Sequence, residues 1–276
     1  MNIVQALQYG CATLNSSESP DIDSQVLLCH ILSCASSYLH TWPDKELTSA
    51  QQEQFENLIE QRQQGQPVAH LTGQRGFWSL DLKVTADTLI PRPDTELLVS
   101  LALEKLTSKM IVADLGTGSG AIGLSLAHEE PSITVFASDA SWEALEVAKH
   151  NAVKYQLSNV QFWNGSWLDA IVDQSLDMVV SNPPYIEADD AHLSQGDVRF
   201  EPMSALASGS DGLDDIRQII VQAKRCLKPA SWLFIEHGYH QAQQIMTLFA
   251  DAGFTNISSH KDYGDNDRVV LGQQPL

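Results

Sequence analysis

Basic side chains, cysteines and long apolar runs are all scarce in this sequence of 276 residues. Lysine and arginine together number 16 against 35 acidic residues, which gives a formal net charge of −19. A charge of that sign repels phosphate polymers, so the composition disfavours stable binding of nucleic acid. The four cysteines are Cys11, Cys29, Cys34 and Cys226, and none of them forms a Cys-x-x-Cys pair. We therefore expect reduced thiols in a cytoplasmic protein and no metal site.

Membrane segments are also not predicted. No stretch approaches the roughly 18 consecutive apolar residues that a spanning helix needs. Residues 1–10 lack the basic start and apolar run of a signal peptide. The chain is nevertheless 43% hydrophobic and 18% charged, a balance that indicates a folded protein with a sizeable core.

The residue pattern changes twice along the chain. Residues 1–72 show only helical spacing of apolar residues, which predicts a small all-helical domain. Residues 73–93 alternate apolar and polar side chains, and we expect a linking β-hairpin with strands over 77–84 and 88–90. Asp94 is expected to cap the helix that follows. Residues 94–276 form the third region.

Strands and helices alternate through this third region. Strands are expected near 110–114, 133–137, 160–163, 176–180 and 232–236, with helices near 121–128, 142–155 and 213–227. A final pair of strands is expected near 255–259 and 268–271. This order is typical of an α/β fold with a mostly parallel sheet and helices on both faces.

A glycine-rich turn marks a candidate cofactor site where the first strand meets its helix. Residues 114–120 read D-L-G-T-G-S-G, and Asp139 ends the next expected strand. Glycines let the backbone approach a ligand closely, and the Asp139 carboxylate can accept two hydrogen bonds from a ribose diol. A dinucleotide fingerprint has the spacing G-x-G-x-x-G, and an acid before it repels pyrophosphate. The pattern favours S-adenosylmethionine, which carries an ammonium group and no phosphate, over a dinucleotide or a tight turn without a ligand.

The segment Asn182-Pro-Pro-Tyr185 follows the strand over 176–180 and is the candidate reactive site. The proline after Asn182 restricts its backbone, so its side-chain amide oxygen can accept one N–H of a planar NH2 group. The Pro183 carbonyl can accept the other N–H, because two consecutive prolines supply no competing amide hydrogen. Tyr185 offers an aromatic face for the flat group. Adenine, cytosine and a glutamine side chain all carry such an NH2, and the loop alone does not choose among them.

Several motifs together make the chain resemble the HemK/PrmC family of release factor glutamine methyltransferases. They are GQPVAHLTG at 65–73, IPRPDTE at 90–96, DLGTGSGAI at 114–122, SNPPYI at 181–186, VRFEP at 198–202 and DYGDN at 262–266. The resemblance implies a class I S-adenosylmethionine-dependent methyltransferase fold, Rossmann-like with a seven-stranded sheet, joined to a small N-terminal helical domain. It implies methyl transfer to the glutamine of the Gly-Gly-Gln motif in peptide-chain release factors, with S-adenosylhomocysteine as the product.

The resemblance also assigns roles to individual residues. Asn182, Pro183 and Tyr185 would be catalytic, and Pro184 would join them in binding the glutamine amide. The cofactor would be bound by Asp114, Gly116, Thr117, Gly118, Ser119, Gly120, Asp139, Trp167 and Asn182. Ser166 departs from the family, whose members commonly have an acid before this aromatic residue, so an adenine contact there is in question.

The roles of several residues and two alternative functions stay open at this point. Arg92 is equally suited to contact substrate or to bridge the domains, and Glu236-His237 is interpreted as structural because the reaction needs no strong base. Phe200-Glu201-Pro202 follows the reactive loop and is suited to order it. An adenine methyltransferase acting on DNA or RNA is the second functional hypothesis, which the acidic composition disfavours. A non-catalytic scaffold that retains the fold is the third.

Overall fold

The computed structural model describes all 276 residues, which form two compact units. Unit 1 comprises Met1–Gln74 together with Gln195–Phe200, and unit 2 comprises Arg75–Ser194 and Glu201–Leu276. The hairpin thus falls almost entirely within unit 2. The short segment 195–200, which lies far along the chain, belongs to the helical unit. None of the helices combines the length and apolar character needed to cross a membrane.

Unit 1 is a helical cluster built on capped helices. Its helices are α1 (Ile3–Thr13), α2 (Pro20–Leu32), α3 (Ser36–Thr41), α4 (Ser49–Gln63) and α5 (Val68–Thr72). Asn2 and Thr48 each form a capping box at the start of α1 and α4, which satisfies backbone N–H groups that have no partner within the helix. Ile3, Leu28 and Phe55 have no exposed surface and anchor the core of this unit. The all-helical character predicted for this region is what the structure has.

The segment 195–200 is held in unit 1 by charged side chains. Arg62 of α4 donates one hydrogen bond to Asp23 Oδ2 at 2.8 Å and another to Asp197 Oδ1 at 2.9 Å. Arg199 donates to the Gln64 carbonyl at 3.1 Å. The side chains of Arg62 and Asp23 are 15% and 9% exposed, so their ion pair is screened less than a surface ion pair.

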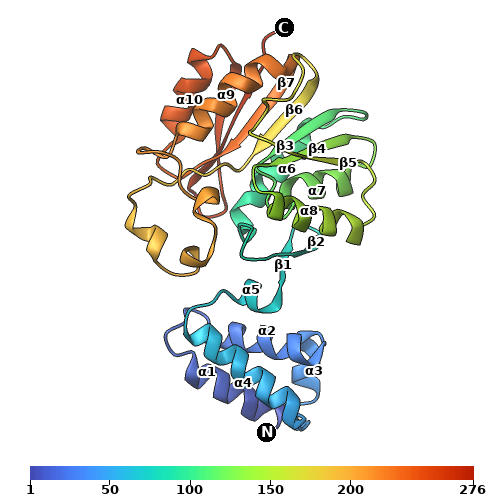
Figure 1. The fold of residues 1–276 in the computed structure, drawn as a ribbon, viewed down its shortest axis with the longest axis vertical. Coiled ribbons are helices and arrows are strands. Elements are labelled where there is room, and N and C mark those ends of the chain that lie inside the picture. Colours follow the sequence, from blue (N-terminus) through green and yellow to red (C-terminus); the bar gives the residue numbers. More distant parts are fainter. The chain divides into compact units, whose positions relative to one another are not determined.

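Unit 2 is a seven-stranded sheet covered by helices on both faces (Figure 1). The strands are β3 (Ile111–Leu115), β4 (Thr134–Asp139), β5 (Val160–Asn164), β6 (Leu176–Ser181), β7 (Leu227–Glu236), β8 (Thr255–Lys261) and β9 (Asp267–Gln273). Their order is β5-β4-β3-β6-β7-β9-β8, and β9 pairs antiparallel with both of its neighbours. The other neighbouring pairs are parallel.

Alternating side chains along the strands divide the core into two layers. Val112 and Val180 pack with α6 (Glu96–Lys105) and α7 (Ala121–Glu129), on the face that α8 (Trp142–Lys154) also covers. Ala113 and Val179 pack on the opposite face with α9 (Asp214–Cys226) and α10 (Ala242–Asp251). Figure 1 shows these two groups of helices on opposite sides of the sheet. Burial on both faces explains why the strands read as near-continuous apolar runs. Helix α10 has no counterpart among the helices expected from the sequence.

The hairpin and the following helix start differ from the sequence expectation. The strands are β1 (Gln74–Phe77) and β2 (Leu80–Lys83), so the expected strand over 77–84 spans the turn and the one over 88–90 does not form. Trp78 lies in the turn with φ of 54°, and its indole N–H donates to Glu129. The aromatic side chain that suggested a strand therefore sits in the turn. Asp94 makes no capping bond, because a 3-10 turn over Pro93–Thr95 precedes α6.

Candidate functional site

The two predicted loops leave neighbouring strands at the same level of the sheet. β3 and β6 pair in parallel with Leu115 opposite Ser181, and Ser181 Oγ donates to the Leu115 carbonyl at 2.8 Å. The strand order reverses between β3 and β6, and open α/β sheets bind ligands outside the carboxyl ends of strands at such a point. The glycine-rich loop and Asn182 therefore emerge side by side where a ligand site is expected.

Asp114 anchors the glycine-rich loop from within the sheet. Its Oδ2 accepts hydrogen bonds from Thr117 Oγ1 at 2.6 Å and from the Gly123 amide at 2.9 Å. Its Oδ1 is buried and has no hydrogen-bond partner. Burial raises the pKa of Asp114 to about 6, and the two hydrogen bonds oppose that rise. The carboxylate thus fixes the loop, and its other oxygen is buried without a partner within the chain.

The glycines of this loop need left-handed backbone conformations. Gly116, Gly118 and Gly120 have φ of 66°, 55° and 91°, where other residues are strained. A Cβ atom on Gly120 would lie 2.5 Å from the side chain of Leu124, whereas one on Gly118 would meet nothing within 4 Å. Gly120 is therefore required for packing of α7 against the loop. Gly118 leaves its backbone open to a ligand.

Asp139 ends β4 beside this loop. Its Oδ2 accepts from the Gly118 amide and its Oδ1 from the Ser141 amide, both at 2.9 Å. Burial raises the pKa of Asp139, while these amide hydrogen bonds favour the charged form. Each carboxylate oxygen can accept a further hydrogen bond, so the group can serve a ribose diol as the sequence suggested.

Trp167 follows β5 and forms a wall of the same site. Its backbone has φ of 44°, a strained value for a large side chain. A Cβ on Gly116 would lie 3.4 Å from the Trp167 ring, so the indole packs over the loop. Ser166 is exposed, and its hydroxyl accepts a hydrogen bond from Gln218 of α9 at 3.5 Å.

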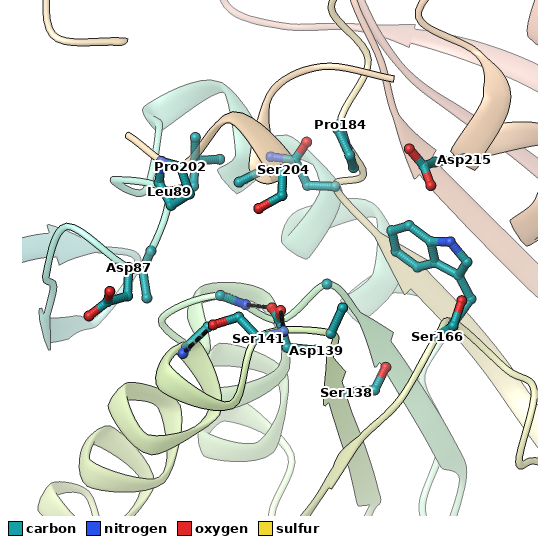
Figure 2. Close-up of a pocket in the computed structure, with 18 of the residues that line it drawn as sticks. Asp87, Leu89, Ser138, Asp139, Ser141, Ser166, Pro184, Pro202, Ser204 and Asp215 are labelled. Carbon is teal, nitrogen blue, oxygen red and sulfur yellow. Dashed lines mark hydrogen bonds between the residues drawn. The ribbon is translucent and has the colours of Figure 1, made fainter. Parts of the chain in front are cut away.

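The ends of these strands enclose a cavity of about 280 Å³. Of the predicted site residues, the cavity is lined by Gly116, Gly118, Asp139, Trp167, Asn182 and Pro184. Figure 2 shows Asp139 and Ser141 on one side of it, Pro184 and Ser204 on the other, and Ser166 and Asp215 at one end. The volume lies near the lower end of the ~300–1,000 Å³ typical of small-molecule sites.

Other predicted residues lie behind the cavity wall. Asp114, Thr117, Ser119, Gly120, Pro183 and Tyr185 are not among the lining residues. Ser119 is buried and its carbonyl accepts from Asn151, so it supports the loop without facing the cavity. The structure therefore brings all the predicted residues to one edge of the sheet but separates those that face the cavity from those that support the two loops.

Asn182 faces the cavity with its acceptor unpaired. Its Nδ2 donates to Thr95 Oγ1 at 3.3 Å, and no group of the chain donates to its Oδ1. The Pro183 carbonyl also receives no hydrogen bond within the chain. Both acceptors lack a partner within the chain, and of the two residues Asn182 is the one that lines the cavity.

Tyr185 is fixed by hydrogen bonds from its amide, its carbonyl and its hydroxyl. Its amide donates to the Leu206 carbonyl at 3.2 Å, its carbonyl accepts from Gln241 at 2.9 Å, and its hydroxyl donates to Glu236 Oε1 at 3.4 Å. Burial raises the pKa of its phenol well above the usual range. Tyr185 therefore ties the loop to β7 and to the start of α10.

Glu201 orders the chain that returns from the reactive loop. It is 6% exposed, accepts from the Ile90 amide at 3.2 Å and pairs with Arg92. Of the two roles open to Arg92, the structure shows an ion pair inside unit 2. Pro202 beside it lines the cavity, in keeping with an ordering role for this segment.

Sequence reasoning missed several residues of the cavity. They include Ser138, Ser141, Ser204, Asp215 and Gln218. Ser138 is next to Asp139, and its buried hydroxyl has no hydrogen-bond partner. Position beside a predicted residue could have identified Ser138 and Ser141. Asp215 and Gln218 come from α9, and no local motif points to them.

The donor set fits S-adenosylmethionine better than a dinucleotide. The cavity combines open glycine backbone, the Asp139 carboxylate and an aromatic wall. The Ser138 hydroxyl that lines it and the Asp114 oxygen behind it lie buried without partners. No lysine or arginine lines the cavity to receive a pyrophosphate. These features match a ligand with an ammonium group, a ribose and an adenine ring.

Comparison with known proteins identifies the family. Residues 5–73 match the family model described as PrmC N-terminal domain, and residues 93–199 match Methyltransferase small domain. The release factor glutamine methyltransferase of Vibrio cholerae serotype O1 is 48% identical over 94% of this chain and 91% of its own length. That of Escherichia coli K12 is 42% identical, with 97% of each chain covered. The chain belongs to the release factor glutamine methyltransferase family.

Solved structures confirm the fold. A methyltransferase from Pyrococcus furiosus aligns with a TM-score of 0.56 at 16% identity, covering 80% of this chain and all 100% of that one. The ribosomal protein L11 methylase of Lactobacillus delbrueckii subsp. bulgaricus aligns with a TM-score of 0.53 at 19% identity, covering 71% and 84%. The predicted class I methyltransferase fold, the family resemblance and the S-adenosylmethionine-dependent methyltransferase activity are therefore confirmed. The scaffold and dinucleotide alternatives are not supported.

Proposed function

We propose that this protein methylates the side-chain amide nitrogen of the glutamine in the Gly-Gly-Gln motif of peptide-chain release factors. The observation that carries the proposal is the register of β3 against β6, with Leu115 opposite Ser181. It sets the cofactor loop beside two unpaired acceptors, Asn182 Oδ1 and the Pro183 carbonyl. Family membership supplies the substrate class, and the pair of acceptors supplies a physical reason for it.

The cofactor is held by the loop and by the ends of β4 and β5. S-adenosylmethionine, when bound, supplies a methyl group on an electron-poor sulfonium sulfur. Asp139 would accept hydrogen bonds from the ribose hydroxyls, Trp167 would cover the adenine and the Gly116–Gly118 backbone would allow close approach. Asp114 lies behind the cavity wall, and the charge on its unpaired Oδ1 attracts the ammonium group without direct contact.

The substrate amide is held in the plane that methyl transfer requires. Asn182 Oδ1 and the Pro183 carbonyl accept its two N–H groups, which leaves the face of the nitrogen directed at the methyl donor. Amide nitrogens are poor nucleophiles, so orientation at ~3–3.5 Å contributes several kcal/mol in place of a strong base. The nitrogen bonds to the methyl carbon as the bond from that carbon to sulfur breaks and S-adenosylhomocysteine leaves. The nitrogen then loses one proton to water, so no residue has to act as a base.

The negative charge of the protein disfavours the rival substrate. A formal charge of −19 gives no electrostatic attraction for DNA or RNA, although an adenine NH2 has the same shape as a glutamine amide. A protein substrate does not require a basic surface. Because release factors act on ribosomes, the proposal places the protein in the cytoplasm.

Unit 1 is proposed to dock the intact release factor. On α2, Ile22 is 63% exposed and Val26 is 41% exposed, one helical turn apart. Contiguous exposed apolar side chains mark protein-binding surfaces, and these two side chains lie next to each other on one helix face. This role rests on the two exposed residues and on the separate compact nature of the unit.

Incubation with a labelled methyl donor, a release factor and DNA tests the proposed function. We expect label in the Gly-Gly-Gln peptide of the factor, located by mass spectrometry, and none in DNA. A factor whose motif glutamine is replaced by glutamate is the matched control and should stay unlabelled. Label in DNA alone would overturn the proposal.

A further inference from the structure

One end of the cavity contains polar groups that the proposed function does not use. Asp215 and Gln218 of α9 line it, together with Ser166 and Trp167 of the loop after β5. Figure 2 shows Ser166 and Asp215 at this end of the cavity. A carboxylate that lines a ligand cavity favours a ligand group that can donate hydrogen bonds to it.

Hydrogen bonds fix α9 against the loop that carries Trp167. Gln222 accepts from the Leu168 amide at 2.7 Å. Gln218 donates to the Ser166 hydroxyl at 3.5 Å. Residues 215, 218 and 222 are three and four positions apart, so they share one face of the helix, and these bonds show that the face is turned toward the loop. Because α9 leads directly into β7, its first turn, which holds Asp215, lies at the edge where the parallel strands end.

Asp215 has one carboxylate oxygen anchored and one without a partner. Its Oδ2 accepts from the Ser208 hydroxyl at 2.6 Å, and its amide donates to the same Ser208 oxygen at 2.9 Å. No group of the chain donates to its Oδ1, and the residue is half-buried. Arg217, the basic residue nearest to it along the chain, pairs with Asp211 and Asp214 instead. The carboxylate is therefore held in place, has no cation beside it and retains an acceptor for a ligand.

The strand order indicates which part of the cofactor belongs at this end. Asn182, which is proposed to hold the substrate amide, follows β6, and Asp139, which is proposed to bind the ribose, ends β4. In the order β5-β4-β3-β6 these two residues lie on opposite sides of β3, and the loop with Trp167 follows β5, beyond Asp139. A cofactor with its methyl group directed toward Asn182 and its ribose at Asp139 therefore directs its base toward β5. That is the end of the cavity that Asp215 lines.

Adenine carries a donor that matches this carboxylate. On the edge of the ring the nitrogen atoms accept hydrogen bonds, and the 6-amino group donates them. An ionised carboxylate only accepts, so the amine is the group on that edge with which it can pair. A hydrogen bond with one charged partner is roughly twice as strong as a neutral one, so such a pair distinguishes adenine from a base without the amine.

We propose that Asp215 Oδ1 recognises the 6-amino group of the adenine of S-adenosylmethionine. Ser208 is its positioning residue, because it holds the other carboxylate oxygen. The inference rests on the proposed function, which places the ribose at Asp139 and the base at Trp167. It makes α9 part of the cofactor site and supplies a charged acceptor where the loop after β5 offers only the hydroxyl of Ser166.

Binding of two ligands to Asp215→Ala tests the contact. The ligands are S-adenosylhomocysteine, which has no sulfonium charge, and its analogue with hydrogen in place of the 6-amino group. By calorimetry, we expect the wild type to bind S-adenosylhomocysteine about 10–100-fold more tightly than the analogue, because the analogue cannot donate to the carboxylate. Asp215→Ala should lose this preference: its affinity for S-adenosylhomocysteine should fall by the same factor, and its affinity for the analogue should stay within about threefold of the wild type.

Two further variants separate the contact from folding and from net charge. Asp215→Asn keeps the shape and can still bond to Ser208, so it carries the test even if the alanine variant does not fold. We expect an intermediate preference of about two- to tenfold, the value of a neutral hydrogen bond. Asp214→Ala removes the same charge from the neighbouring position, where the side chain is 67% exposed and does not line the cavity. This matched control should keep the wild-type preference.

The inference and the proposed function fail in different ways. Equal losses of affinity for the two ligands in Asp215→Asn would overturn the contact with the amine, since a purely structural role affects both ligands alike. Equal affinity of the wild type for the two ligands would also overturn it. Unchanged affinity of both Asp139→Ala and Trp167→Ala for S-adenosylhomocysteine would instead overturn the proposed placement of the cofactor. Neither result changes the identity of the methylated substrate, which the labelling experiment measures separately.

Discussion

The glycine-rich loop and the reactive loop start at paired residues, yet they are stabilised in different ways. The first is held mostly by the motif itself and by the end of the next strand: Asp114 accepts from Thr117 and from the Gly123 amide, and Asp139 accepts from the Gly118 amide. The second is held by segments far along the chain. Asn182 donates to a residue 87 positions away, and the Tyr185 carbonyl accepts from one 56 positions away.

This difference determines how much of each loop's conformation can be predicted from its sequence motif. Asp114 and the glycines that set the backbone of the cofactor loop all lie within D-x-G-x-G-x-G. The motif therefore predicts both the chemistry and the conformation of that loop. The Asn-Pro-Pro-Tyr segment specifies the chemistry, and its orientation depends on residues that no motif joins to it. Changes in the reactive loop should therefore affect turnover, and changes in the cofactor loop should affect affinity for the methyl donor.

Asn182→Ala should have the largest effect. It removes an acceptor that orients the reacting group, and we expect kcat to fall about 10²–10³-fold, as for other positioned hydrogen-bond groups. Affinity for the methyl donor, measured by calorimetry, should change by no more than about threefold, because the lost contact is mainly to substrate. An unchanged rate would show that residue 182 has been misassigned.

Asp139→Ala should affect the cofactor loop and therefore binding of the methyl donor. It removes the acceptor for the ribose hydroxyls and the bond to the Gly118 amide, and we expect affinity for the methyl donor to fall about 10–100-fold. Calorimetric titration measures this directly, and kcat at saturating donor should stay near the wild-type value. Asp173→Ala, at an exposed ion pair outside the cavity, is the control and should bind normally. A loss confined to kcat would contradict the division between the loops.

Acid should weaken binding of the methyl donor through Asp114. Its pKa is raised to about 6, so below that pH the folded protein carries a neutral group that no longer attracts an ammonium. We expect affinity to fall by up to about tenfold per pH unit below 6. The same shift acts oppositely on stability: because the folded pKa exceeds the unfolded value, the contribution of this group to the free energy of unfolding increases as the pH falls through 6. Asp114→Asn, titrated from pH 5 to 8, should lose this pH dependence, and a slope equal to the wild type would exclude Asp114 as its source.

The smallest effect is expected from the exposed face of α2. Ile22→Ser combined with Val26→Ser should raise KM for intact release factor about three- to tenfold, since each side chain contributes about 1 kcal/mol or less at a partly exposed contact. Steady-state kinetics with a short Gly-Gly-Gln peptide should not change. Val221→Ser, at an aliphatic residue of α9 that is 68% exposed, is the matched control. Equal KM values for the intact factor would remove α2 from the proposed docking surface.

The parallel sheet and the placement of its loops could be predicted from the sequence because each strand is a buried apolar run followed by a distinctive turn. The hairpin could not be read correctly, since Trp78 favours a strand by residue type and nevertheless occupies the turn. Asp94 has the residue type of a helix cap but lies beside Arg268 at 3.6 Å, and the turn buries Thr95 instead. Tertiary contacts decide both cases, and no local pattern records them.

The residues that support the site were the hardest to predict from the sequence. Glu236 was interpreted as structural because no step requires a base, and in the structure it is buried and accepts a hydrogen bond from Tyr185. Its position beside Asn182 follows from the pairing of β6 with β7, which a single sequence does not specify. Asp215 and Gln218 reach the cavity from α9 for the same reason.

The assignment of residues 195–200 to the helical unit limits how this protein can be taken apart. The chain passes from one unit to the other after residues 74, 194 and 200, so no single cut yields both units intact. A shortened chain that begins at Arg75 leaves Asp197 without Arg62 and Arg199 without the Gln64 carbonyl. Such a truncation deprives the stretch that leads from Tyr185 to Glu201 of its anchors as well as removing the helices. Loss of activity in such a fragment therefore does not test release factor docking. Single surface substitutions test it more directly.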